Sequence, residues 1–108
     1  MNYSVKPIPV FERQAMRLIR KYPSLKKEPL ELGVSLKQKP EIGIPLGNQC
    51  FKIRIAIASK GKGKSGGARI ITHIQVTETT VYMLTIYDKT ERPDITDKEL
   101  DDLLKLVP

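Results

Sequence analysis

The strongest constraint on the fold comes from residues 50–69, where two alternating runs flank a stretch rich in glycine and lysine. In Phe51–Ala58, large apolar residues alternate with Lys52, Arg54 and alanine, which is the period-two pattern of a half-buried strand. Lys52 and Arg54 must then share one face, opposite the apolar residues. A second alternating run covers Ala68–Val76. The segment therefore predicts neighbouring strands joined by a flexible cationic loop.

The same segment is strongly basic. Between positions 52 and 69 it has six positive charges and no carboxylate: Lys52, Arg54, Lys60, Lys62, Lys64 and Arg69. Residues 1–76 carry 15 Lys/Arg against 4 Asp/Glu, whereas residues 77–108 carry 4 against 8, for a total net charge of +7. A basic body with an acidic end predicts a polyanionic partner such as RNA or DNA. The alternative is a well-solvated basic surface without such a partner.

The rest of the chain completes an α+β pattern. Its predicted elements are a short strand over Tyr3–Pro7, amphipathic helices over Val10–Tyr22 and Leu25–Lys37, a connecting loop over Gln38–Asn48, a strand over Val81–Tyr87 that is apolar on both faces, and a helix that begins at the capping box of Thr96 and Glu99. Ser24 is the expected cap of the second helix, which Pro29 and Gly33 interrupt. The order is β-α-α-β-β-β-α, and we expect one domain over residues 1–108, a small antiparallel sheet with a helical hairpin on one face.

Composition excludes several classes of protein. No apolar run approaches the length of a membrane span, and the first residues lack the apolar centre of a signal peptide. The single cysteine and single histidine among 108 residues argue against a disulfide framework, a multi-cysteine zinc site and a histidine metal centre. We therefore expect a cytoplasmic protein with no metal and no cofactor.

Particular segments give the chain a family resemblance. The helical hairpin, FKIRIAIA, KGKGKSGGARIIT, VYMLTIYDK and ERPDITDKELDDLL, in this order, resemble the RelE/ParE superfamily of type II toxins. GKSGGAR and LTIYDK are most similar to its RelE/HigB-like branch. The resemblance implies an mRNA endoribonuclease that acts in the ribosomal A site, with a cognate antitoxin that occludes or distorts the active site. Its expected partners are thus an antitoxin, mRNA and the ribosome.

The resemblance also implies a set of catalytic residues. Two basic strand residues of the RelE pattern match Lys52 and Arg54, an arginine at the start of the next strand matches Arg69, and a basic residue after the last central strand matches Lys89. Metal-free cleavage needs a base for the 2′-hydroxyl, cations for the phosphoryl oxygens and an acid for the 5′-oxygen. We expect Lys52 as the base, Arg54 and Arg69 as phosphate clamps, and Lys89 as the acid or a charge stabiliser.

The expected RNA contacts lie nearby. Lys60, Lys62 and Lys64 should contact the RNA backbone without sequence preference, unless their loop is only a soluble hairpin connection. Some RelE proteins have a tyrosine in the C-terminal segment, where this chain has residues 93–95, Pro-Asp-Ile. Tyr87 could supply base stacking instead, although packing in the core is an equal alternative.

Four other interpretations remain open. Lys52 and Arg54 could be the solvated face of a sheet, and Arg69 could form an ion pair with Asp88 or Asp94. The whole chain could be a ParE-like inhibitor of DNA gyrase, which needs no basic catalytic cluster. It could also be a non-catalytic nucleic-acid-binding domain.

Overall fold

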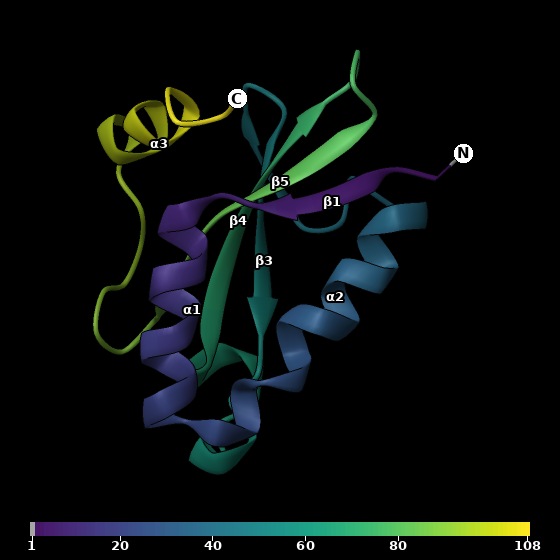
Figure 1. Ribbon diagram of the computed structural model, residues 1–108. Coiled ribbons are helices and arrows are strands. Elements are labelled where there is room, and N and C mark those ends of the chain that lie inside the picture. The colour runs from purple at the N-terminus through teal and green to yellow at the C-terminus, as the bar shows by residue number, and fades with distance from the viewer. Residues whose placement is uncertain (1) are drawn as a thin grey trace.

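The computed structural model describes residues 2–108, and its central feature is a five-stranded sheet (Figure 1). The strand order is β1-β5-β4-β3-β2. The strands are β1 (Ser4–Pro7), β2 (Ile44–Gly47), β3 (Cys50–Ile55), β4 (Ala68–Gln75) and β5 (Thr80–Asp88). β2 to β5 pair antiparallel in succession, and β1 adds to β5 in parallel. The α+β class and the helical hairpin over one face are confirmed, with a fifth strand and a parallel edge that were not expected.

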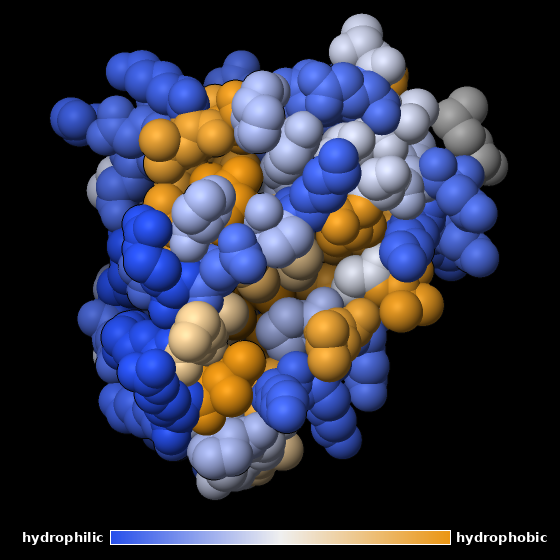
Figure 2. Space-filling model, in the orientation of Figure 1, coloured by the Kyte–Doolittle hydropathy of each residue, from blue (hydrophilic) through white to orange (hydrophobic). Residues whose placement is uncertain are grey.

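Two helices cover one face of this sheet. They are α1 (Pro9–Lys21) and α2 (Lys27–Gln38), joined by the 3-10 turn Pro23–Leu25, and the chain ends with α3 (Asp97–Leu104). In Figure 1, α1 and α2 lie in front of the strands. Figure 2, from the same side, shows hydrophobic side chains in the furrow between these helices and hydrophilic ones along the outer side of α1. No helix within residues 2–108 is long and apolar enough to cross a membrane.

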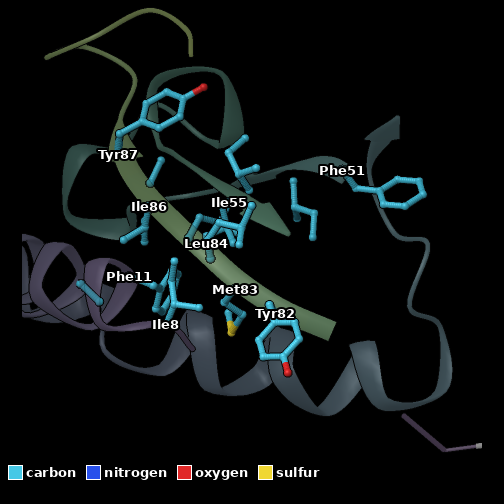
Figure 3. Close-up of a cluster of buried hydrophobic side chains, with 14 of the residues drawn as sticks. Ile8, Phe11, Phe51, Ile55, Tyr82, Met83, Leu84, Ile86 and Tyr87 are labelled. Atoms are coloured by element: carbon cyan, nitrogen blue, oxygen red, sulfur yellow. The ribbon is translucent and has the colours of Figure 1, made fainter. Parts of the chain in front are cut away.

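The core forms where α1 packs on the sheet. Phe11, Ala15 and Leu18 recur at helical spacing, and all three are buried, as expected for an amphipathic helix. All nine residues of β5 are buried, which confirms the prediction of a central strand that is apolar on both faces. Figure 3 shows Ile8 and Phe11 on one side of β5 and Tyr87 pointing away from them. The side of the sheet that carries Tyr87 is therefore the side opposite α1.

The expected loop over residues 38–48 proves partly wrong, because it contains strand β2. Pro45 has no N–H to donate and glycines flank it, so the sequence lacks the usual signal of a strand. An edge strand tolerates these residues, and the β2–β3 register shifts between Pro45 and Gly47. Asn48 and Gln49 both have positive φ, at 54° and 60°, as a tight hairpin turn requires.

The second helix is confirmed in outline but starts later than expected. Pro29 occupies the third position of α2, where a backbone N–H would have no partner within the helix, so it does not break the helix. The prediction that Ser24 caps this helix is wrong. α2 has no side-chain cap, and Ser24 Oγ instead accepts the N–H of Ser59 at 3.3 Å. Ser24 thus ties the helical hairpin to the loop after β3.

The strand ends also differ from the expectation. β3 stops at Ile55, and the 3-10 turns Ala58–Lys60 and Lys64–Gly66 fold the following loop. A Cβ on Gly67 would collide with the carbonyl oxygen of Ile55, so glycine permits the close return of the chain into β4. The expected cap of α3 is confirmed, since Thr96 and Glu99 form a reciprocal capping box.

Candidate active site

Three of the expected site residues form one row across the sheet. Arg54 of β3 lies opposite Arg69 of β4, and Arg69 lies opposite Tyr87 of β5. Directly opposed residues share a face, so all three project from the side away from α1. Lys52 is two residues before Arg54 and joins this face, where it lies opposite Ile71. The sheet therefore brings Lys52, Arg54, Arg69 and Tyr87 together, and we call them the polar row.

Arg69 is the most unusual member of the polar row because it is charged and only 4% exposed. Its Nη1 donates to the carbonyl oxygens of Lys64 at 2.9 Å and Ala68 at 3.0 Å. Burial lowers its pKa, and the neighbouring charge of Arg54 lowers it further. Within residues 2–108 it makes no salt bridge with a carboxylate. The alternative of an ion pair with Asp88 or Asp94 is therefore wrong, and Arg69 retains positive charge for an anionic ligand.

Lys52 has a partner that the sequence did not predict for it. Its Nζ donates to Asp94 Oδ1 at 3.3 Å, with the two side chains 20% and 61% exposed. The same oxygen accepts the N–H of Ile95 at 2.8 Å and the hydroxyl of Tyr87 at 3.4 Å. The bond from the Ile95 N–H, followed by the bond and charge of Lys52, holds the pKa of Asp94 below its ordinary value, although burial opposes this. A carboxylate therefore lies at the edge of the polar row.

Tyr87 is packed and is only 3% exposed. Burial, with the adjacent charge of Asp94 and the bond to it, raises its pKa to about 12. The guanidinium of Arg92 lies 5.3 Å from the centroid of the ring. The phenol therefore keeps its proton at neutral pH and can donate it in a hydrogen bond, whereas its ring is already covered. This geometry favours core packing over the stacking on a base that we considered.

The three loop lysines are not equivalent. Lys62 and Lys64 are exposed, which suits contact with a long polyanion. Lys60 has its ammonium 2.6 Å from Asp88 Oδ1 and 3.0 Å from Thr90 Oγ1, and its side chain is only 11% exposed. Lys60 is thus part of the fold rather than of the exposed surface that Lys62 and Lys64 form.

Lys89 lies one residue beyond the end of β5 and is exposed. Its backbone N–H donates to the carbonyl oxygen of Gly67 at 3.0 Å, so this end of β5 is fastened to the start of β4. Lys89 follows Tyr87 by two residues, and Gly67 precedes Arg69 by two residues. The backbone of Lys89 therefore lies next to the polar row.

Sequence reasoning missed Arg92 on this face and considered Asp94 only as a partner of Arg69, not of Lys52. Arg92 covers Tyr87 and forms an ion pair with Glu99 of α3. The segment that carries both residues passes α1 between β5 and α3 (Figure 1), where Glu91 pairs with Arg17 at 2.9 Å and with Lys21 at 3.1 Å. The charged residues after LTIYDK were the available signal, but only the path of this segment brings Asp94 to Lys52.

Cys50 and His73 also lie on this face, in directly opposed positions of β3 and β4. Sγ of Cys50 is 3.5 Å from Nδ1 of His73. Burial raises the pKa of the thiol to about 11 and lowers that of the imidazole. At neutral pH both groups are uncharged, so this pair does not supply a thiolate nucleophile.

The chemistry of the site follows from its charges. Two guanidinium groups and one ammonium group gather on one face with a phenol that keeps its proton. Forked guanidinium donors match the oxygens of a phosphate group. Positive charges fixed in place by a sheet stabilise negative charge that develops on such oxygens during a reaction. The arrangement is thus suited to binding and polarising a phosphodiester.

Comparison with known proteins agrees with this fold. A family profile described as the RelE toxin of the RelE/RelB toxin–antitoxin system matches residues 8–107. The RelBE2 toxin–antitoxin complex from Mycobacterium tuberculosis contains a chain with 20% identity and a TM-score of 0.61, covering 82% of this chain and 92% of its own length. A mutant Escherichia coli RelE toxin in the free state has 16% identity and a TM-score of 0.59, with full coverage of both chains.

The isolated Escherichia coli RelE toxin gives a third match, at 17% identity and a TM-score of 0.53, covering 97% of this chain and 99% of its own. These similarities to solved structures show the shared fold. The family profile extends over nearly the whole sequence, from the start of α1 to beyond α3. The chain therefore belongs to the RelE toxin family.

Proposed function

We propose that this protein is the toxin of a type II toxin–antitoxin pair and cleaves mRNA on the ribosome. The observation that carries this proposal is the polar row, in which Arg54, Arg69 and Tyr87 occupy consecutive strands and Arg69 is buried without a salt bridge in the described chain. Keeping a charge at a buried position without a carboxylate is unfavourable for folding. Such a charge is typical of a site selected for an anionic ligand.

In the proposed reaction, Arg54 and Arg69 hold the non-bridging oxygens of the scissile phosphate. The 2′-hydroxyl attacks the adjacent phosphorus, and the bond from phosphorus to the 5′-oxygen breaks. This leaves a 2′,3′-cyclic phosphate on one fragment and a 5′-hydroxyl on the other. The guanidinium groups stabilise the negative charge that grows on the phosphoryl oxygens. Tyr87, which keeps its proton, can donate a further hydrogen bond.

The proton acceptor follows from the pair of Lys52 and Asp94. Lys52, in its uncharged form, is the base that accepts the proton of the 2′-hydroxyl, as expected from the sequence. Asp94, whose Oδ1 lies 3.3 Å from Lys52 Nζ, orients that base. Lys89, exposed at the end of β5, donates a proton to the leaving 5′-oxygen.

The partners follow from the same proposal. Lys62 and Lys64 contact the backbone of the RNA or of the ribosome, because exposed lysines bind polyanions with little sequence preference. The similarity to the toxin chain of the RelBE2 complex supports an antitoxin partner. Such an activity places the protein in the cytoplasm, where mRNA is translated.

The test is induced expression followed by mapping of transcript 5′ ends. We expect new 5′ ends within translated regions for the wild type, and their loss for Arg54→Ala. Arg54 is exposed, so its removal should leave the fold intact. Arg13→Ala removes an exposed arginine from α1, far from the polar row, and serves as the matched control. Growth arrest with intact transcripts and blocked DNA supercoiling would contradict the proposal and favour a gyrase inhibitor.

A further inference from the structure

The cationic loop is fastened at its base by a buried ion pair. Lys60 Nζ lies 2.6 Å from Asp88 Oδ1, at the end of β5, and Asp88 is completely buried. The same carboxylate oxygen accepts the N–H and the hydroxyl of Thr90, at 3.0 and 2.9 Å. The Lys60 ammonium also lies 5.1 Å from the centroid of the Tyr22 ring. The start of the loop is thus joined both to the last central strand and to the end of α1.

This ion pair is linked to the polar row through the loop. Four residues after Lys60, the carbonyl oxygen of Lys64 accepts the Nη1 donor of Arg69. Beyond it, the carbonyl oxygen of Gly67 accepts the N–H of Lys89, the residue after Asp88. The loop therefore provides the carbonyl that orients Arg69, and the ion pair fixes one end of that loop.

We propose that Lys60 is a positioning residue and does not contact the RNA. Its ion pair with Asp88 holds the loop against β5, so that Arg69 and Lys89 stay aligned on the scissile phosphate. The inference rests on the proposed function, because it concerns the geometry of the same reaction. It replaces the expectation from the sequence that Lys60, like Lys62 and Lys64, binds the RNA backbone.

The energetics support a role in fixing geometry. Asp88 is buried, its Oδ2 has no hydrogen-bond partner within the described residues, and the cation that contacts its carboxylate is Lys60. Removal of one partner from a buried pair leaves an uncompensated charge, which the structure can relieve only by opening. The loop contains four glycines between positions 61 and 67, so it has little stiffness of its own. Small misplacements of a group that stabilises a transition state lower the rate strongly.

Two variants with opposite effects on net charge separate positioning from RNA contact. Lys60→Met removes a positive charge, and Asp88→Asn removes a negative one. Positioning predicts that both lower kcat for ribosome-bound mRNA by about tenfold or more while KM changes less than about threefold. Direct contact predicts a raised KM for Lys60→Met only, because Asp88→Asn would release Lys60 toward the RNA.

Further variants exclude a simple loss of folding. Lys60→Arg keeps the cation and should restore most of kcat. The double variant Lys60→Met/Asp88→Asn removes both charges, so it should recover the unfolding midpoint but not kcat. Lys98→Met removes a lysine that is 85% exposed on α3 and should leave kcat unchanged. Hydrogen exchange of the Thr90 amide, which donates to Asp88, should become faster in both single variants.

The outcomes distinguish failure of the positioning role of Lys60 from failure of the proposed function. If the wild type cleaves mRNA and Lys60→Met keeps the wild-type kcat, the positioning role is wrong and the proposed function stands. If the double variant recovers both the stability and kcat of the wild type, the positioning role is also wrong. The loss of kcat in the single variants would then follow from their lower stability alone. If the wild type does not cleave mRNA at all, the proposed function fails and the inference fails with it.

Discussion

At the scale of single residues, the polar row combines interactions that are unfavourable for folding. Arg54 and Arg69 are directly opposed on neighbouring strands, where like charges destabilise a sheet. Arg69 is also buried, and its bonds to two carbonyl oxygens do not neutralise it. A bound phosphate would relieve both penalties, because its negative charge would lie between the two guanidinium groups. This is the physical reason to interpret the row as a binding site.

Two substitutions of Tyr87 separate the contribution of its hydroxyl group from the contribution of its buried ring. The bond from its hydroxyl to Asp94 is long, at 3.4 Å, so Tyr87→Phe should change the free energy of unfolding by less than about 1 kcal/mol. The ring is buried, so Tyr87→Ala should lower that free energy by about 3–5 kcal/mol. Chemical denaturation of the two variants and the wild type measures these free energies of unfolding. An alanine variant as stable as the phenylalanine variant would show that the ring is available to stack on a base.

At the scale of elements, the loop between β3 and β4 combines a buried part and an exposed part in one short segment. Its start, through Lys60, belongs to the buried framework, whereas Lys62 and Lys64 are exposed. The glycines allow the chain to turn sharply between these parts and to pass close to Ile55 at Gly67. The loop thus leaves Lys62 and Lys64 exposed while Lys60 anchors it at its base.

A charge reversal in this loop tests the exposed part. Lys62→Glu with Lys64→Glu should weaken RNA binding and lower the slope of log affinity against log salt by about 1.5, because two phosphate contacts are lost. The matched control reverses Lys98 of α3 and Lys105, the residue after α3, which are 85% and 78% exposed, and changes the net charge equally. Titrations at several salt concentrations measure the slope. Equal slopes for the two double variants would mean that Lys62 and Lys64 make no phosphate contacts.

Local pattern was sufficient for much of the fold and for part of the site. Alternation predicted β3 and β4, and with them the shared face of Lys52 and Arg54, because side chains alternate in every strand. β2 carries Pro45 and Gly47 within only four residues, so its pairing depends on β3 rather than on its own sequence. The pairs of Lys60 with Asp88 and of Lys52 with Asp94 join residues that are 28 and 42 positions apart. Such partners depend on the path of the whole chain, which no local pattern contains.

At the scale of the whole molecule, the uneven charge of the sequence has a structural outcome. The acidic C-terminal part returns across the basic body, and Asp88, Glu91 and Asp94 each pair with a cation from an earlier element. These pairs hold the segment after β5 in place beside the polar row. Part of the charge asymmetry is therefore neutralised by ion pairs within the fold, whereas cations such as Lys62 and Lys64 stay exposed.

The pH dependence of stability tests the strongest of these pairs. Burial alone would raise the pKa of Asp88, but the bonds from Lys60 and Thr90 and the charge of Lys60 lower it to about 2, from an ordinary value of 3.8. A depressed pKa in the folded state stabilises the protein above the pKa of the unfolded chain. That contribution, about 2 kcal/mol, is lost as pH falls from 4 toward 2.

The measurement compares the wild type with Asp88→Asn in denaturant titrations between pH 6 and pH 2. The difference between their unfolding free energies should stay constant down to about pH 4 and then shrink by about 2 kcal/mol. A difference that is independent of pH over this range would show that Asp88 is not held as a carboxylate by Lys60.

The most direct test of the central claim is a double-mutant cycle on the cleavage rate. The rate constant for ribosome-bound mRNA at saturating protein is measured for Arg54→Ala, Arg69→Ala and the double variant. If both arginines hold one phosphate, each single change should lower the rate about 100-fold, and the double variant should fall less than about tenfold below the slower single one. Losses that multiply, to about 10,000-fold in the double variant, would show that the two arginines act independently and would contradict a shared phosphodiester site.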